Sequence, residues 1–252
     1  MSENAKKWKQ VPWLRIGAEA VAIIASILIA FALDAWWDRR ELAEREAWYL
    51  ESLEKDCMEN RESLEHVIQV QNDVMESIQK LVLFGATGTP TLDADSVVSL
   101  VTRIFGDINI GFSPNLGTYQ ELLNTSSLQV IRSDSLRALL ADFGVRVGRV
   151  SGMQDMASDG WNRDITEHLM TRMDLAVALP QYLLGVDSIV DIRPSGVDYR
   201  SLPSDPVFRN IMVGRLAVTA VRLSMYRALE ESVDEILTIL GQELGHEQYR
   251  TS

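Results

Sequence analysis

The feature that most constrains this chain is an apolar run near its start, Ile16–Leu33, which contains a single charge at Glu19. With Leu14 in front and Trp36–Trp37 behind, the run reaches about 20 to 24 residues, the length at which a helix crosses a hydrocarbon layer of ~30 Å. Tryptophan is typical of the boundary between the bilayer and water, which suits the pair at the end of the run. The sequence therefore predicts a transmembrane helix over residues 16–37.

The charges on either side of the run predict its orientation. Four Lys/Arg residues precede it against one acid, Glu3, whereas the flank behind it, residues 38–41, is nearly neutral. Because the cytoplasmic flank carries the excess of Lys and Arg, residues 1–15 are expected in the cytoplasm and residues 38–252 outside it. We therefore expect a single-pass protein of a bacterial inner membrane with a periplasmic C-terminal domain.

A cleavable signal peptide is the alternative to an uncleaved anchor. Ala30–Ala32 has the small-x-small form that signal peptidase accepts. The apolar run continues past this site, however, and a strongly helix-forming stretch follows Trp36–Trp37 without a break. These features favour the uncleaved signal-anchor.

Small side chains recur at every fourth position of the predicted span. Such a stripe permits close approach of a second helix, so we expect association with another copy or with a membrane partner, and the alternative is that the stripe faces lipid. Glu19 is an intramembrane carboxylate, which is often functional, but it also lies one helical turn from Arg15 and suits an ion pair with it. The predicted association face consists of Ala18, Ala22, Ser26 and Ala30.

The remaining chain reads as helical. Apolar residues at spacings of three and four predict a helix with one apolar face, and no proline or glycine interrupts residues 35–84. We expect an all-α protein in which the transmembrane helix continues into an elongated antiparallel helical bundle. Ser188–Ile192 reads as a short strand or extended chain, and Met153, Met156, Met170 and Met173 read as core residues. The predicted body helices cover residues 35–84, about 93–105, 116–124, about 133–178 with a break near 158–160, and about 206–241.

Composition and motifs exclude several function classes. The chain has a net charge of −12 and the first 15 residues carry +3, so the remainder carries −15, which does not suit a nucleic-acid partner. The single cysteine, Cys57, excludes an internal disulfide and reads as a buried thiol. Nucleotide-binding, hydrolase and zinc-protease motifs are missing from the sequence. Two pairs have ligand-like spacing, Asp164 with His168 and Glu243 with His246, but neither completes a metal site, so no metal and no cofactor is predicted.

Two blocks of sequence resemble a family of uncharacterised bacterial single-pass membrane proteins, a domain of unknown function that opens with a "GE…GILIAL…W" segment. The resemblance covers roughly residues 15 to 145 and implies a membrane span followed by a long extracytoplasmic helix. It implies no activity, because the family has no established function. The first block is carried by Gly17–Glu19, Ile27–Ala30, Trp36–Trp37 and Tyr49–Leu50, and the second by Gly117–Leu122, Ser126–Leu128, Ile131 and Leu136.

From these observations we expect a membrane-anchored extracytoplasmic scaffold or sensor rather than an enzyme. The bilayer is its predicted partner, with self-association or a membrane partner through the transmembrane helix. An accessory subunit of a membrane complex, docked through the stripe Ala18–Ala30, is the second interpretation. An enzyme of unrecognised type is the third.

Overall fold

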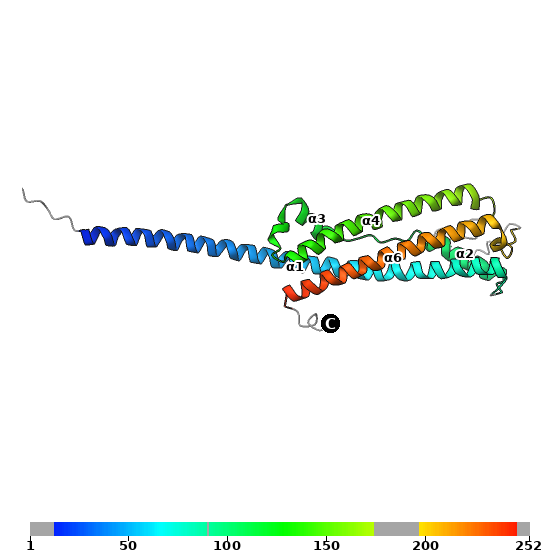
Figure 1. Ribbon diagram of the computed structural model, residues 1–252, viewed down its shortest axis with the longest axis horizontal. Helices are drawn as coiled ribbons and strands as arrows, with labels where there is room; N and C mark the ends of the chain where they lie inside the picture. Colours follow the sequence, from blue (N-terminus) through cyan, green and yellow to red (C-terminus); the bar gives the residue numbers. More distant parts are fainter. Residues whose placement is uncertain (1–12, 90, 174–196, 246–252) are drawn as a thin grey trace, which may run out of the picture. The chain divides into compact units, whose positions relative to one another are not determined.

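The computed structural model describes residues 13–89, 91–173 and 197–245. Within these ranges every regular element is helical and no strand occurs, which confirms the expected all-α class. Short turns accompany the helices, namely the 3₁₀ turns η1 (Ser127–Val130) and η4 (Leu202–Ser204) and the π-helical turn η2 (Ile165–Leu169). The α-helices are α1 (Trp13–Thr87), α2 (Ala94–Asp107), α3 (Gly117–Asn124), α4 (Asp134–Asp164) and α6 (Pro206–Glu243) (Figure 1).

The chain divides into two compact units, Met1–Tyr49 and Leu50–Ser252. In the described part of the first unit, the segment 17–34 of α1 is exposed throughout. Ion pairs between residues four apart follow it, Arg40 with Glu44 and Arg45 with Glu41, each at 2.8 Å between nitrogen and oxygen. Such pairs support an exposed helix by a few tenths of a kcal/mol each.

The second unit is a helical bundle built on α4, α6 and the part of α1 that starts at Leu50. Figure 1 shows α6 running opposite to α4, and residues of these two helices pack against each other. Buried residues recur along α6 at spacings of three and four, from Phe208 through Met212 and Tyr226 to Leu240. The apolar stripes that define the helices in the sequence are thus the faces that the bundle buries.

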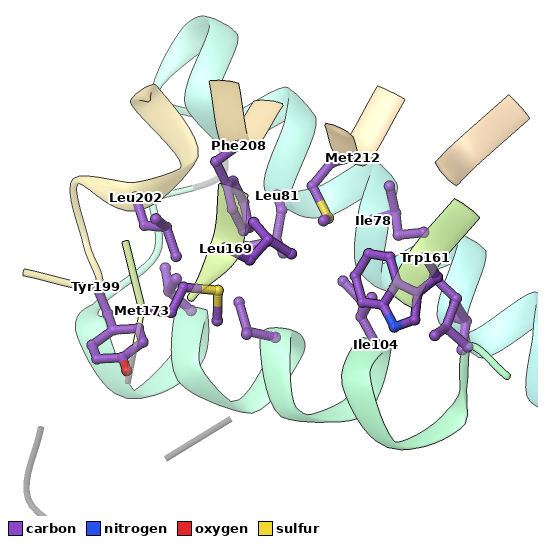
Figure 2. Close-up of a cluster of buried hydrophobic side chains, with 14 residues drawn as sticks. Ile78, Leu81, Ile104, Trp161, Leu169, Met173, Tyr199, Leu202, Phe208 and Met212 are labelled. Carbon is purple, nitrogen blue, oxygen red and sulfur yellow. The ribbon is translucent and has the colours of Figure 1, made fainter. Parts of the chain in front are cut away.

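One end of the bundle closes over a cluster of buried apolar side chains, which we call the apolar cluster. Side chains from α1, α2, α4 and α6 meet there, and Figure 2 shows Trp161 and Phe208 among them. The ring of Phe105 on α2 meets that of Trp161 edge to face at 4.9 Å. The cluster contains Val74, Ile78, Leu81, Val97, Val101, Ile104, Ile108, Trp161, Leu169, Met173, Tyr199, Leu202, Phe208 and Met212.

Local signals explain where three of the helices begin and end. The Asp93 carboxylate accepts a hydrogen bond from the Ser96 backbone at 2.8 Å and caps α2. Asp205 accepts one from the Val207 backbone at 2.7 Å and caps α6, with Pro206 at the first helical position. The left-handed Gly88, with φ of 73°, follows the last residue of α1.

The structure departs from the sequence-based expectation at several places. The predicted break near 158–160 is wrong, because α4 continues to Asp164. Met173 is buried as expected, but Met156 and Met170 are exposed, so their assignment to the core is wrong. The predicted strand or extended chain at Ser188–Ile192 lies outside the described residues.

Candidate functional site

The apolar segment of α1 has the length and composition of a membrane span. Eight large apolar side chains in it are exposed by 49 to 67%, and none of the residues in its most apolar window is buried. Burying a fully exposed side chain of this kind is worth roughly 1.5 to 3 kcal/mol. Because these eight are exposed only in part, burying all of them in lipid is worth on the order of 10 kcal/mol. The exposed residues are Val21, Ile23, Ile24, Ile27, Leu28, Ile29, Phe31 and Leu33.

Aromatic side chains follow the segment where an interfacial belt is expected. Trp36 and Trp37 are both more than half exposed, and their rings meet edge to face at 5.4 Å. The guanidinium of Arg40 lies 5.9 Å from the centre of the Trp36 ring, which places a cation beside the aromatic pair. This combination suits the headgroup region of a bilayer.

The predicted association face is present as an exposed stripe of small side chains. Its four members, Ala18, Ala22, Ser26 and Ala30, are all exposed. The Ser26 hydroxyl donates to the Ile23 carbonyl at 2.8 Å, so its proton is used within its own helix and only its oxygen can accept a bond from a second helix. Glu19 is exposed, and the side chain of Arg15, its expected partner, lies outside the described side chains.

The second unit contains a set of polar side chains that the sequence analysis missed, which we call the polar clamp: the buried Gln71 of α1, Arg222 and Tyr226 of α6, and the half-buried Gln154 of α4. All four bond to one another or to residues 107–112, which begin at the last residue of α2 and continue into the connection to α3; we call them the loop 107–112. Because the clamp draws on three helices, it fixes the position of this loop against the bundle.

Arg222 is the buried cation of the polar clamp. It is 3% exposed, and it donates to the carbonyls of Ile108 at 2.7 Å and Ile110 at 2.9 Å. Its guanidinium also contacts Tyr226, donating to the hydroxyl at 3.1 Å. A buried guanidinium is costly unless it is fully hydrogen-bonded, and carbonyl oxygens supply that bonding here. Gln71 donates from the other side to the carbonyls of Asp107 and Ile110.

Gln154 bonds both backbone groups of one loop residue. Its amide oxygen accepts from the Phe112 backbone N–H at 2.7 Å, and its amide nitrogen donates to the Phe112 carbonyl at 3.1 Å. The same oxygen accepts from the Tyr226 hydroxyl at 2.7 Å. Phe112 is 3% exposed, so water cannot replace these bonds. The hydrogen bonds that its buried backbone N–H and carbonyl require come from Gln154.

Asparagine and aspartate side chains fix the other end of the loop. Asn60 of α1 bonds the Asn115 backbone through both groups, accepting from its N–H at 2.6 Å and donating to its carbonyl at 2.8 Å. Asp56 accepts from the Thr118 backbone N–H at 3.0 Å at the start of α3. α1 therefore positions both the loop and the short helix that follows it.

Burial shifts the pKa values of two side chains in the second unit, Asp107 and Cys57. Burial raises the pKa of the Asp107 carboxyl, against the opposing charge of Arg103. Burial also raises the pKa of the Cys57 thiol to about 12, with the nearby carboxylates of Asp56 and Glu54 acting in the same direction. Cys57 is 3% exposed, which confirms the expected buried thiol, and a thiol with that pKa is not a nucleophile at neutral pH.

A surface groove of about 490 Å³ lies where α6 begins and α4 ends. Arg215, buried at the floor, bonds the Asp164 carboxylate at 2.5 Å, donates to the Ala157 carbonyl and lies 5.3 Å from the Trp161 ring centre. His168 lines the groove as part of η2, a π-helical turn of a kind that is frequent at functional sites.

The candidate metal pairs from the sequence have different outcomes. The Asp164 carboxylate bonds Arg215 rather than His168. The Nε2 atom of His168 lies 3.9 Å from a carboxylate oxygen of Glu167. Glu243 ends α6, and His246 lies outside the described residues. Among the described residues no group of three His, Cys, Asp or Glu side chains is arranged to hold a metal ion.

A signal for the missed residues was present in the sequence. Arg215 and Arg222 occupy positions on the apolar stripe of α6, where a charge must find buried partners. Their partners could not be named, because they lie in a distant helix and a loop.

No family model matches the chain, and comparisons with curated proteins and with solved structures find no match either.

Proposed function

We propose that the protein is a membrane-anchored helical scaffold or sensor, with residues 1–15 in the cytoplasm and residues 38–252 in the periplasm. The observation that carries the proposal is the exposed apolar segment of α1, which a water-soluble protein would have to bury. Membership of the uncharacterised "GE…GILIAL…W" family is part of the proposal and implies the same architecture.

The polar clamp supports a binding or mechanical role rather than an enzymatic one. Gln71, Gln154 and Arg222 bond backbone groups of the chain itself, and Tyr226 bonds Gln154 and Arg222, so the clamp positions a loop instead of presenting reactive groups to a substrate. A sensor needs an element that ligand or partner binding can bias. The loop 107–116 is the candidate element, because α1, α4 and α6 all bond to it.

Reporter fusions test the orientation. A periplasmic reporter such as alkaline phosphatase joined after Ser252 should be active, and a cytoplasmic reporter at the same place should be silent. The reverse pattern would contradict the proposed orientation, which rests on four Lys/Arg residues in front of the span.

A pulldown from detergent-solubilised membranes separates the remaining roles. A bound small molecule favours a sensor, a recurrent membrane partner favours an accessory subunit, and neither result leaves a scaffold. The accessory role is the second candidate, and the exposed stripe Ala18–Ala30 favours it.

The accessory role and self-association share a matched test. Ala22→Leu/Ser26→Leu fills the small-residue face while keeping the segment apolar, so membrane insertion should survive and crosslinking to a neighbouring helix should fall. The control Ile24→Val/Leu28→Val changes two residues of the same spacing on another face of the helix. Equal crosslinking in both variants would show that the stripe faces lipid.

A further inference from the structure

Polar side chains around the groove at the start of α6 keep hydrogen-bonding capacity that the described residues do not use. The Asp164 carboxylate bonds Arg215 through Oδ2 alone, at 3.1 Å to Nε and 2.5 Å to Nη2, and its side chain is still 27% exposed. No described residue donates a hydrogen bond to its second oxygen, Oδ1. His168 Nε2 is 3.9 Å from the Glu167 carboxylate, which is too far for a hydrogen bond. The exposed amide of Asn210 also lines the groove and bonds to none of the described residues.

Apolar side chains form the rest of the groove. Val207, Ile211 and Val218 of α6 line it and are half-buried. A Cβ atom placed on Gly214, which lies among them, would meet nothing within 4 Å, so the groove is open at this point. The volume of about 490 Å³ lies in the range of roughly 300 to 1,000 Å³ that is usual for small-molecule sites. Such sites combine an apolar lining with a few polar groups that orient the ligand, which is the combination found here.

The charges around the groove favour a neutral ligand. Arg215 at the floor is 7% exposed, and the Asp164 carboxylate beside it balances its charge. A cationic ligand that approached Asp164 would meet the Arg215 guanidinium, and an anionic ligand that approached Arg215 would meet the carboxylate. Either charged ligand would also lose hydration without gaining an unpaired counter-charge. A neutral group that both donates and accepts a hydrogen bond meets neither cost.

We propose that the groove binds a small neutral molecule that has an apolar body and an amide or hydroxyl head. The N–H or O–H of the head donates to Asp164 Oδ1, and its oxygen accepts from the Asn210 amide. The apolar body packs on Ile211 and Val218. The inference is independent of membrane anchoring. It gives the proposed sensor a class of ligand, and its failure would leave the reporter-fusion test of orientation untouched.

Methyl NMR spectroscopy of the full chain in detergent, with isoleucine and valine methyl groups labelled, tests the site. The probes are benzamide, benzoate and benzylammonium, which have similar shapes but are neutral, anionic and cationic. Benzamide should shift the methyl resonances of Ile211 and Val218 in a saturable way, and its Kd should be lower than that of either charged probe by about tenfold or more. Val145 and Val221 are exposed valines that do not line the groove, so their resonances serve as internal controls and should not shift.

Substitutions in the groove place the probe. Gly214→Leu fills the groove, and Gly214→Ala is the matched control, because its added methyl group meets nothing within 4 Å. Leucine and alanine both favour a helix more than glycine does, so α6 is not weakened in either variant. The Kd of benzamide should be about tenfold higher, or more, in Gly214→Leu than in Gly214→Ala. Asn210→Ala should raise the Kd about three- to tenfold through loss of one hydrogen bond, whereas Asn124→Ala, at an exposed asparagine that ends α3, should leave it unchanged.

Three results would overturn the proposal. Benzamide that causes no saturable shift at Ile211 and Val218 would show that the groove is not a binding site for this class of molecule. A charged probe that binds as tightly as benzamide would contradict the neutral ligand. Equal Kd values in Gly214→Leu and Gly214→Ala would show that the probe binds outside the groove.

Discussion

Replacing Gln154 with leucine should destabilise the second unit by about 3 kcal/mol. The substitution removes three hydrogen bonds, two to the Phe112 backbone and one from the Tyr226 hydroxyl. Each buried polar group that loses its partner costs about 1 to 3 kcal/mol, and the added apolar side chain offsets part of the loss. Leucine and glutamine have similar helix propensities, so α4 itself is not weakened. For a unit of about 200 residues, the expected fall in Tm is about 6 to 12 °C.

Thermal unfolding of the full chain, followed by circular dichroism at 222 nm in detergent, measures the effect. Gln69→Leu is the matched control, because Gln69 is an exposed glutamine on α1 and its replacement should stay within about 0.5 kcal/mol of the wild type. Amide hydrogen exchange supplies a local readout, since the Phe112 N–H should lose protection in Gln154→Leu alone.

The reasoning would be refuted by a Gln154→Leu protein that melts within about 2 °C of the Gln69→Leu control. Unchanged protection of the Phe112 amide in Gln154→Leu would refute it equally. Either result would mean that the loop 107–112 is held by its apolar contacts and that the polar clamp is not what positions it.

Further changes at Asp205, Arg215 and Cys57 test the remaining contacts by the same thermal measurement, with maleimide labelling added for Cys57. Asp205→Ala should cost about 1 kcal/mol through loss of the α6 cap, and Asp205→Asn should cost less because it keeps an accepting oxygen. Partial burial alone would raise the pKa of Asp205, but hydrogen bonds from the Val207 backbone and from Arg172 hold it below 3.8, so this stabilisation should be lost as the pH falls below that value. Arg215→Met should cost about 3 kcal/mol, because the Asp164 carboxylate would lose its partner, and a loss under 1 kcal/mol would argue against the ion pair. The Cys57 thiol should resist maleimide at neutral pH. Because its pKa is raised in the folded state, the free energy of unfolding should fall as the pH rises from 9.0 towards about 12. A Cys57→Ala protein that loses stability equally over this range would contradict the assignment.

Features that depend on a few neighbouring residues could be predicted from the sequence. The start of α6 at Asp205 and Pro206 was predictable because a cap bonds the backbone two or three residues ahead. At the start of α2 the sequence offers two candidate caps, Asp93 and Asp95, and the structure uses Asp93. The apolar run in α1 was predictable because composition alone decides whether a helix can cross a bilayer.

Features that depend on distant partners could not be predicted. Gly160 reads as a helix breaker, yet α4 passes through it, because the glycine makes room for a side chain of another helix: a Cβ atom there would lie 3.0 Å from Arg215 Nη2. Gly144 leaves similar room for Tyr119 of α3. The partners of Arg222 are carbonyl groups of a loop more than 100 positions earlier in the chain, which no local pattern reveals.

The most direct test of membrane anchoring is the intact mass of the protein recovered from alkaline-washed membranes. Washing removes peripheral proteins, so a protein anchored by the apolar segment of α1 should remain in the membrane pellet. We predict the full-length mass of 28.3 kDa there. A product shortened by about 32 to 35 N-terminal residues and released into the soluble fraction would instead identify the segment as a cleaved signal peptide and would contradict the anchored scaffold.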